Sequence, residues 1–413
     1  MQSGREYGKI KPIPETDSQE KEPMKILITT DLFTTQTNGV VRSVKNLRRE
    51  LIALGHEVRI LTLSEGSYSY RLGNVYYIRS LPLGAVYPDV RMPTSFRHKL
   101  MRQLIAWRPD VIHSQCEFFS FQFAHYISKR TGAPIVHTYH TLYEQYVGYV
   151  MPVKELGDVT VSNLSRLRLK RVRRIIAPTR KVEETLRGYG LTAPISVVPS
   201  GIKLEQHKFR FSAAERCRKR QALGIGENDR VLVNIGRLGY EKNLQELVRF
   251  FAPVCRDNPH LFFLIVGDGP AREKLQKLAQ ELGVENRVIF TGMVPPAQVQ
   301  HYYQLGDIFV SASTSETQGL TYIEAAANGL PLLCRKDPCL DGVLLPGENG
   351  YDYTDEAQFR TALETMLGQD DWRTEAGKCS EQVAAGYSIQ NFGRNVEKIY
   401  QEVIGQRSAM EET

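Results

Sequence analysis

The sequence predicts an α/β protein with two doubly wound, Rossmann-like domains. Short apolar runs alternate with amphipathic stretches from Met24 almost to the end of the chain, which is the pattern of strands and helices that follow one another. The pattern restarts after a polar, basic stretch at 208–220, so two sheets are expected. The chain has 413 residues, which is enough for two cores of ordinary size.

The first domain is predicted to span residues 24–200. It opens with a strand at 25–30, a helix at about 40–54 that Gly55 ends, and a strand at 58–63. Further strand-like runs, with helical stretches between most of them, occur at 75–80, 110–114, 134–139, 174–179 and 195–200. This succession is typical of a parallel sheet with helices on both faces.

The second domain is predicted to span residues 201–388. Its strand-like runs occur at 231–237, 262–269, 287–292, 307–313 and 331–335. A last amphipathic stretch, about 389–405, is a candidate helix that crosses back onto the first domain. Because open α/β sheets bind ligands at the carboxyl ends of their strands, we expect the two domains to face each other across a ligand-binding cleft.

Composition excludes several classes of protein. Residues 1–23 are polar and interrupted by proline, without the apolar core of a signal peptide, so we expect a disordered tail on a cytosolic protein. The longest apolar runs, such as 261–266, are far shorter than the ~20 residues that span a bilayer. The six cysteines are scattered and have no paired histidines, so neither a metal site nor a disulfide framework is predicted.

Positive charge is concentrated in the first domain. Residues 24–200 hold 25 Lys and Arg against 12 Asp and Glu, a balance of +13, whereas the whole chain carries +7. A basic half of this kind predicts an anionic partner surface, either nucleic acid or membrane. Two stretches, 91–107 and 166–174, mix basic with apolar residues.

The stretch at 91–107 is the candidate membrane contact. Its basic residues are interleaved with apolar ones: Arg97, Lys99 and Arg102 with Phe96, Leu100, Met101, Leu104 and Trp107. A helix of this pattern can lie on anionic headgroups with its apolar side chains inserted. A solvated basic face is the alternative for each stretch. Nucleic-acid binding has no support beyond charge, so no nucleic-acid partner is predicted.

The segment ETQGLTYIE, residues 316–324, follows a predicted strand and opens a helix. It would place free backbone N–H groups at a helix N-terminus, where they attract a phosphate; these are the groups of Gln318, Gly319, Leu320 and Thr321. Glu316 precedes this turn and Glu324 lies one to two helical turns inside it, so one carboxylate can meet sugar hydroxyls and the other a ribose. An ordinary helix start with acidic residues nearby is the alternative.

The segment GRLGYEKN, residues 236–243, supplies the complementary charge. Arg237 and Lys242 would provide the fixed positive charge that a departing diphosphate requires. Together the two segments predict a nucleotide-sugar site. A third segment, GDGPAR at 267–272, lacks the last glycine of a dinucleotide fingerprint, and we interpret it as a tight turn leading into a helix.

Two residues of the first domain are candidates for the same site. Gly39, in TNGVVRSV at 37–44, follows the loop after the first strand, where a missing side chain would let a donor phosphate approach the backbone. His140, in TYHTLYEQY at 138–146, follows a strand, so its side chain is expected at the cleft. A plain turn glycine and a core histidine are the alternatives.

The segments GRLGYEKN, VGDGP, SETQGLTYIEAAANGLP and NGY together resemble the retaining glycosyltransferases of family 4, which have the two-domain GT-B fold, and the resemblance covers nearly the whole chain after Met24. It implies that Arg237 and Lys242 bind the diphosphate, that Glu316 contacts the donor sugar and that Glu324 holds the ribose. It also implies a nucleobase near Gly292 to Val294 and a backbone cradle at 318–321. Gly39 would then lie at the phosphate, and His140 beside the anomeric carbon and the 6-hydroxyl.

The forms HTLYEQY and KDPCLDG (336–342) resemble the diacylglycerol glucosyltransferases of bacteria. This resemblance implies transfer of glucose from UDP-glucose to the 3-hydroxyl of 1,2-diacylglycerol, with retention, by a cytosolic enzyme peripheral to the inner face of the cell membrane. The motifs require no metal or other cofactor, because two cations and a helix dipole already oppose the phosphate charge. The alternatives are another acceptor, such as phosphatidylinositol or a polysaccharide, another donor, such as a GDP-sugar, and a catalytically silent membrane-binding module.

Overall fold

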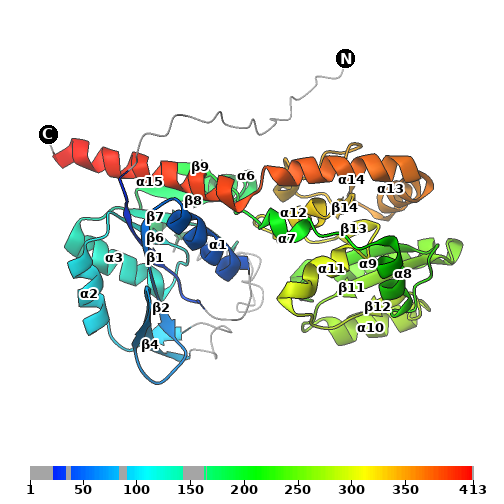
Figure 1. Cartoon of the computed structure of the whole chain (residues 1–413), viewed down its shortest axis with the longest axis horizontal. Helices are drawn as coiled ribbons and strands as arrows, with labels where there is room; N and C mark the ends of the chain where they lie inside the picture. Colours follow the sequence, from blue (N-terminus) through cyan, green and yellow to red (C-terminus); the bar gives the residue numbers. More distant parts are fainter. Residues whose placement is uncertain (1–21, 34–38, 83–90, 143–161, 164, 412–413) are drawn as a thin grey trace, which may run out of the picture. The chain divides into compact units, whose positions relative to one another are not determined.

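The computed structural model describes residues 22–33, 39–82, 91–142, 162–163 and 165–411, so the predicted tail lies almost wholly outside the described residues. The described chain divides into two compact units (Figure 1). The N-terminal unit comprises the residues up to Gly201 together with those from Ile389 onward, and the C-terminal unit comprises Ile202–Ser388. Each unit is built around one sheet.

The sheet of the N-terminal unit has the strand order β3-β4-β2-β1-β6-β7-β8-β9, with β5 beside β4. Its neighbours are parallel except for the pairs β3 with β4 and β4 with β5. The strands are β1 (Lys25–Thr29), β2 (Glu57–Ser64), β3 (Tyr70–Leu72), β4 (Val75–Pro82), β5 (Arg91–Pro93), β6 (Val111–Ser114), β7 (Ile135–Thr138), β8 (Arg174–Ala177) and β9 (Ile195–Val197). The sequence does not predict β3 and β5, because each has three residues and no apolar run.

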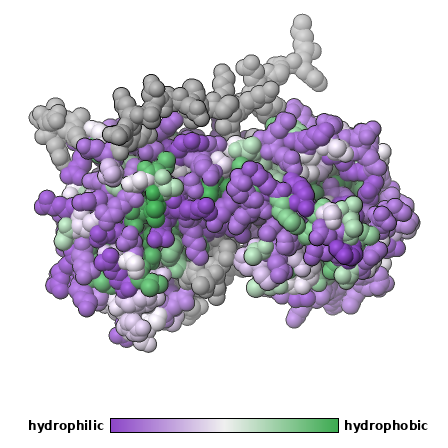
Figure 2. All heavy atoms as spheres, in the orientation of Figure 1, coloured by the Kyte–Doolittle hydropathy of each residue, from purple (hydrophilic) through white to green (hydrophobic). Residues whose placement is uncertain are grey.

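Helices cover both faces of this sheet. They are α1 (Gly39–Ala53), α2 (Lys99–Trp107), α3 (Phe119–Thr131), α6 (Arg180–Gly188) and α15 (Ile389–Glu411). Successive side chains of a strand point to opposite faces. Leu27 of β1 therefore packs in one core with α2 and α3, whereas Ile26 and Ile28 pack in the other with α1 and α15. Hydrophilic residues cover most of the face shown in Figure 2.

The last helix, α15, packs against α1 and belongs to the N-terminal unit, as its amphipathic pattern predicts. Tyr400 of α15 lies with its hydroxyl 2.6 Å from Nδ1 of the buried His113. Glu397 of the same helix is 3.2 Å from Nε2 of His56. Both contacts are buried, so α15 is fixed to the sheet by polar as well as apolar contacts.

The interpretation of 91–107 as a membrane-inserting surface is wrong in its apolar part. Leu100, Met101 and Leu104 of α2 are buried in the core of the N-terminal unit. Phe96 packs edge-on against Phe123 of α3, with ring centroids 4.9 Å apart. The amphipathic pattern of this stretch therefore serves the core of its own domain.

Trp107, at the end of α2, is also held within the unit. Its Nε1 donates a hydrogen bond of 2.9 Å to Glu57, and the guanidinium of Arg59 lies 4.2 Å from the centre of its ring. Arg97, Lys99 and Arg102 are exposed. This surface consequently offers positive charge without the predicted apolar anchors.

The second basic stretch, 166–174, is partly structural as well. Leu169 and Val172 are buried, whereas Leu167 is exposed. Arg168 donates to the backbone oxygen of Glu117, and Arg174 of β8 pairs with a carboxylate of α15. Part of its charge therefore holds the N-terminal unit together.

The sheet of the C-terminal unit is wholly parallel, with the order β12-β11-β10-β13-β14-β15. Its strands are β10 (Arg230–Ile235), β11 (Leu261–Val266), β12 (Val288–Phe290), β13 (Ile308–Ser311), β14 (Leu332–Arg335) and β15 (Gly350–Tyr353). The helices are α7 (Leu204–His207), α8 (Ala213–Gln221), α9 (Leu244–Asp257), α10 (Arg272–Glu281), α11 (Val299–Tyr303), α12 (Leu320–Ala327), α13 (Glu356–Gly368) and α14 (Asp370–Ala385). Short 3-10 helices occur as η1 (Tyr240–Lys242), η2 (Pro296–Gln298) and η3 (Pro338–Leu340).

Two cores fill the two faces of this second sheet. Every residue of β11 is buried, which explains why it reads as one continuous apolar run rather than an alternating one. The prediction of two doubly wound α/β sheets is thus confirmed. Within the ranges described above, none of the helices combines the length and the apolar character needed to span a bilayer.

Candidate active site

The order of strands in the C-terminal sheet places a topological switch point between β10 and β13. The chain goes from β10 outward to β11 and β12, and then returns to the other side of β10 as β13. At such a point the loops that leave the two central strands diverge and open a ligand site at their carboxyl ends. Residues 236–243 follow β10 and residues 312–319 follow β13, so both predicted motifs leave the sheet at this edge.

Lys242 and Glu316 meet in an ion pair. The Nζ atom of Lys242, at the end of η1, lies 2.5 Å from Oε1 of Glu316 in the loop before α12. The two loops are tied again where the hydroxyl of Ser315 donates to the backbone oxygen of Glu241 at 3.1 Å. The structure therefore joins the two segments that the sequence assigned to one site.

Arg237 is the more accessible of the two predicted cations, with 57% of its side chain exposed. It pairs with Glu241, whose side chain is only 6% exposed. A Cβ added at Gly239 would collide with this carboxylate, so the glycine is needed for Glu241 to lie beneath the turn. Glu241 positions the guanidinium of Arg237, and the sequence analysis did not single it out.

The residue before α12 leaves the start of this helix without a side-chain cap of its own. Gly319 is the residue before the helix, has a φ of 70° and provides no side-chain cap. A Cβ there would also overlap the ring of Tyr322, whose hydroxyl is held 3.1 Å from Oγ of Ser311. Gln318 is buried, and Leu320 and Thr321 are half-buried. This helix start has the geometry expected of a phosphate-binding turn.

Glu324 lies deeper than the sequence suggests, with 4% of the residue exposed. Its Oε2 accepts a hydrogen bond of 3.1 Å from the hydroxyl of Tyr303 on α11. The carboxylate is therefore oriented by a tyrosine that carries no motif signal of its own. Its predicted contact with a ribose stays a prediction.

Gly292, the predicted neighbour of the nucleobase, has a left-handed backbone with a φ of 72°. Its carbonyl oxygen accepts a hydrogen bond of 3.1 Å from the backbone N–H of Gly267. A Cβ at Gly267 would collide with the carbonyl of Gly236, and one at Gly269 would lie 2.6 Å from the carbonyl oxygen of Leu238. The segment 267–272 is thus a tight turn into α10, as interpreted, and its glycines let three loops pack backbone to backbone.

In the N-terminal unit, His140 lies just beyond β7. Its Nε2 is 2.8 Å from Oε1 of Gln115, which follows β6. Burial lowers the pKa of His140 to about 4, so the imidazole is neutral at neutral pH. Gly39 is the exposed first residue of α1, and no atom of the described residues lies within 4 Å of the place where a Cβ would be. Residues 37–38 and 143–146 of the same motifs lie outside the described residues.

A buried polar cluster at the carboxyl ends of β1, β6 and β7 was missed by the sequence analysis. It consists of Asp31, Gln115, Glu117 and His137 beside His140. Burial, and then the charge of Glu117, raise the pKa of Asp31 to about 6, while hydrogen bonding from Ser120 lowers it. Asp31 directly follows the first strand, which is the signal that singled out His140.

Among the residues that the structure describes, three atoms of this buried polar cluster have no hydrogen-bond partner: Oδ2 of Asp31, Nε2 of Gln115 and Nδ1 of His137. An unpaired buried polar atom costs about 1–3 kcal/mol, so several at one sheet edge indicate groups that are kept for a ligand. No group of three or more His, Cys, Asp or Glu with the geometry of a metal site occurs in the part of the chain that the structure describes.

Comparison with known proteins identifies the family. Residues 37–206 match the family model described as Glycosyltransferase Family 4, and residues 215–382 match the model described as Glycosyl transferases group 1. The two matches fall on the N-terminal and C-terminal units in turn.

Individual proteins give the same result. The chain is 33% identical over 384 residues to the alpha-monoglucosyldiacylglycerol synthase of Streptococcus pneumoniae, covering 92% of this chain and 86% of that protein. It is 28% identical over 391 residues to the synthase of the same name from Acholeplasma laidlawii, covering 92% of this chain and 98% of that protein. The crystal structure of Anabaena HepE in complex with UDP-glucose has a TM-score of 0.71 at 17% identity, covering 92% of this chain and all of that one, and supports the fold alone. The chain therefore belongs to glycosyltransferase family 4 and has the GT-B fold.

Proposed function

We propose that this protein transfers glucose from UDP-glucose to the 3-hydroxyl of 1,2-diacylglycerol with retention of the α configuration, at the cytosolic surface of a membrane. The donor half of the proposal is carried by Lys242 and Glu316, which meet close to the start of α12 at the switch point of the C-terminal sheet. The acceptor half is supported by the two synthases that match 92% of this chain.

The diphosphate is the centre of the proposed chemistry. The bond from C1 of glucose to the diphosphate oxygen breaks while a bond from C1 to the acceptor oxygen forms on the same face of the sugar. The acceptor's proton passes to the departing phosphate oxygen. Because negative charge on the leaving group grows as the bond breaks, Arg237, Lys242 and the α12 N–H groups stabilise the transition state more than the ground state. These positive groups make a metal ion unnecessary in this proposal.

The N-terminal unit carries candidate groups for binding sugar and acceptor hydroxyls. The neutral imidazole of His140 can hydrogen-bond the 6-hydroxyl of the glucose. The unpaired Oδ2 of Asp31 and Nε2 of Gln115 are suited to bind the acceptor hydroxyl. No protein nucleophile is needed, because the acceptor attacks from the side of the leaving group.

The proposed reaction is tested by incubating the protein with a panel of nucleotide sugars and lipid acceptors and by identifying the product by mass and linkage. The expected product is an α-glucosyl-diacylglycerol formed from UDP-glucose. Transfer to phosphatidylinositol alone, or from a GDP-sugar alone, would replace the proposed substrates within the same family. No transfer with any pair would contradict the proposal.

The two carboxylates of the donor site should differ in which ligand they help to bind. Glu324→Gln is expected to lower the affinity for UDP and for UDP-glucose alike by about tenfold, which is the scale of one hydrogen bond to a charged group. Glu316→Gln should weaken the binding of UDP-glucose. Its affinity for UDP should be unchanged or higher, because the substitution releases Lys242 from its ion pair. Calorimetric titration of both variants with both ligands measures this. Equal losses of UDP affinity in the two variants would rule out these roles.

Membrane binding should be wholly electrostatic. Each basic residue near an anionic surface contributes about 1 kcal/mol, so changing the exposed Arg97, Lys99 and Arg102 together to Glu should weaken binding to phosphatidylglycerol vesicles by ~100-fold or more. High salt should abolish the binding, because the apolar side of α2 is buried. Vesicle co-sedimentation measures both effects. The matched control changes Lys208, Lys277 and Lys378, exposed lysines of the C-terminal unit, to Glu. If the protein bound neutral vesicles as strongly as phosphatidylglycerol vesicles, the electrostatic account would be refuted.

A further inference from the structure

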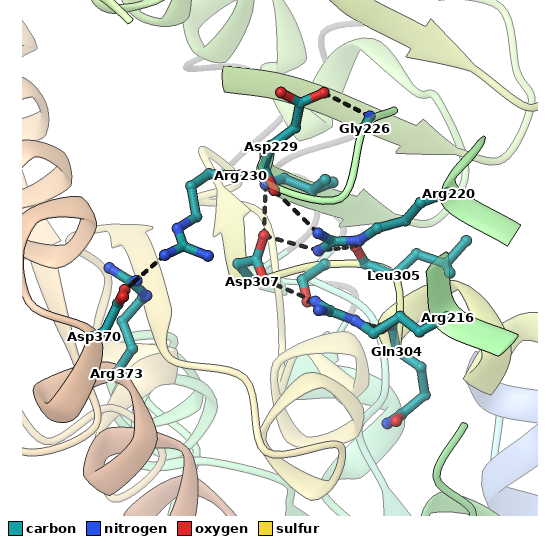
Figure 3. A network of polar contacts seen from close by, with 12 residues as sticks. Arg216, Arg220, Gly226, Asp229, Arg230, Gln304, Leu305, Asp307, Asp370 and Arg373 are labelled. Carbon is teal, nitrogen blue, oxygen red and sulfur yellow. Dashed lines mark hydrogen bonds and ion pairs between the residues drawn. The ribbon is translucent and has the colours of Figure 1, made fainter. Parts of the chain in front are cut away.

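A hollow of about 380 Å³ lies in the C-terminal unit at the edge of the sheet opposite the donor motifs. Asp307, in its lining, immediately precedes β13, whereas the donor loop follows Ser311 at the other end of that strand. At 3.3 Å per residue the two ends are ~13 Å apart. Four arginines and two aspartates line the hollow, which we call the arginine pocket: Arg210, Arg216, Arg230, Arg373, Asp307 and Asp370. Figure 3 shows how most of these side chains converge.

One side of the arginine pocket is structural. Asp307 receives hydrogen bonds from Arg216 at 2.7 Å, from Arg220 at 2.8 Å and from the backbone N–H of Val231 at 2.8 Å. Its side chain is 12% exposed, and that of Arg220 is 3% exposed. This carboxylate is saturated, so Asp307 and Arg220 hold the start of β13 to α8 and are not free to bind a ligand.

The other side is an exchangeable ion pair. Arg230 and Arg373 both point to Asp370, whose side chain is 70% exposed (Figure 3). Nη2 of Arg230 donates to Asp370 at 2.8 Å, and no other partner of this guanidinium occurs among the described residues. Burial, and then the positive charge of Arg230, lower the pKa of Arg373. Arg373 also donates hydrogen bonds to the backbone oxygens of Met366 and Leu367. Two guanidinium groups nevertheless share one exposed carboxylate, so two positive charges face a single negative charge.

A phosphate monoester would supply the additional negative charge that the two guanidinium groups can bind. It carries nearly two negative charges and three acceptor oxygens, and guanidinium groups bind it in bidentate geometry. The pocket also lies at the N-terminus of α14, through Asp370, Arg373 and Thr374, where the helix dipole favours an anion. Its volume is at the lower end of the ~300–1,000 Å³ range of small-molecule sites, which suits a small sugar or glycerol phosphate.

The pocket is connected to the donor site. Tyr303, Gln304 and Asn328 belong to its lining. The hydroxyl of Tyr303 donates to Oε2 of Glu324 at 3.1 Å, and Nδ2 of Asn328 donates to the backbone oxygen of Glu324 at 2.8 Å. Gln304 is joined to Asn328 by a further hydrogen bond of 2.9 Å. Tyr303 is fully buried, so a ligand in the pocket would act on it and on Glu324 by displacing the neighbouring Gln304 and Asn328.

We propose that the arginine pocket is a regulatory site for a phosphate monoester, which displaces Asp370 from Arg230 and Arg373 and changes donor affinity through Tyr303 and Asn328. Binding at the pocket is independent of the reaction. The regulatory half rests on the proposed function, because it assigns Glu324 to the donor. The same phosphate chemistry occurs in soluble metabolites and in the headgroup of phosphatidic acid, and the experiment distinguishes the two.

The first test is calorimetric titration of the full chain with glycerol 3-phosphate at low salt. The wild-type protein should bind it, Arg230→Gln should bind at least about tenfold more weakly, and Asp370→Asn should bind more tightly because the competing carboxylate is gone. Arg360→Gln is the matched control, since Arg360 is an arginine of α13 that pairs with Asp257 and Glu364 outside the pocket lining. Thermal unfolding checks that each variant folds.

The proposal would be overturned if the wild-type chain bound neither glycerol 3-phosphate nor vesicles containing phosphatidic acid, if Arg230→Gln bound the ligand equally well, or if Asp370→Asn bound it more weakly. Lys242→Ala should keep the wild-type affinity for glycerol 3-phosphate, and its loss there would place the ligand in the donor site instead. In parallel, vesicles containing phosphatidic acid are compared with neutral ones. Loss of the vesicle binding in Arg230→Gln, without any binding of soluble glycerol 3-phosphate, would assign the pocket to a lipid headgroup and overturn the metabolite site.

The coupling between the arginine pocket and the donor site is tested by titrating the protein with UDP, with and without saturating glycerol 3-phosphate. The UDP affinity should change in the wild-type protein and stay constant in Tyr303→Phe, which keeps the ring but cannot donate to Glu324. An unchanged UDP affinity in the wild-type protein would refute the regulatory half. If UDP does not bind at all, the proposed function fails, and the titrations with glycerol 3-phosphate alone decide whether the pocket is a site.

Discussion

Replacing Lys242 by Ala should lower the rate of glucose transfer by about 100-fold or more, the scale of losing one strong electrostatic donor in a transition state. The ammonium group opposes charge that develops on the leaving diphosphate, so the loss should appear mainly in kcat. Removing it also leaves Glu316 without its ion pair beside the diphosphate, which adds repulsion. Arg237→Ala should act in the same direction. Initial rates with saturating UDP-glucose measure both variants.

The matched control for this prediction is Lys277→Ala. Lys277 is an exposed lysine of α10 that faces Glu281 at 3.8 Å, so it has a similar ion pair away from the donor motifs. Its transfer rate should equal that of the wild-type protein. Near-normal turnover in both Lys242→Ala and Arg237→Ala would show that the diphosphate does not bind at this edge of the C-terminal sheet.

The Asp31→Asn variant is expected to gain stability and lose activity. The pKa of the Asp31 carboxyl is raised from 3.8 to about 6 in the folded protein, chiefly by burial. Between these pH values the folded state holds a proton that the unfolded state has released, so stability falls as pH rises through this window. At pH 7 and above the buried carboxylate costs about 3 kcal/mol in the free energy of unfolding. Asparagine removes this cost, but it replaces the unpaired Oδ2 acceptor by a donor, so transfer to the acceptor should fall.

Urea unfolding at pH 4 and at pH 7.5 tests the predicted direction of this pH-dependent change in stability. The change Trp372→Phe leaves Trp107 as the fluorescent reporter of the N-terminal unit, since the chain has two tryptophans. Asp31→Asn should be more stable than its parent at pH 7.5 and nearly equal to it at pH 4. Glu285→Gln, at an exposed loop position, should shift neither value. A stabilisation of the same size at both pH values would mean that ionisation of Asp31 is not its cause.

The local pattern of apolar and polar residues was enough to predict the architecture of the two sheets. The apolar runs of the second domain became β10, β11, β12, β13 and β14 in the predicted succession, because a buried parallel strand needs a nearly continuous apolar segment. The short antiparallel strands β3 and β5 escaped prediction because pairing with β4, rather than any apolar run of their own, makes them strands. The membrane interpretation of α2 failed because an amphipathic stripe is equally required by a core.

The sequence by itself determined the family, the two sheets and the segments that carry the donor motifs, because these depend on residue type and on spacing along the chain. Only the tertiary structure decided which groups meet. It paired Lys242 with Glu316 across 74 residues, set Tyr303 against Glu324, and gathered Asp31, Gln115 and His140 from the ends of three strands. Strand order brings these residues together, and strand order depends on long-range packing. The raised pKa of Asp31 likewise follows from burial, which no local pattern at that residue encodes.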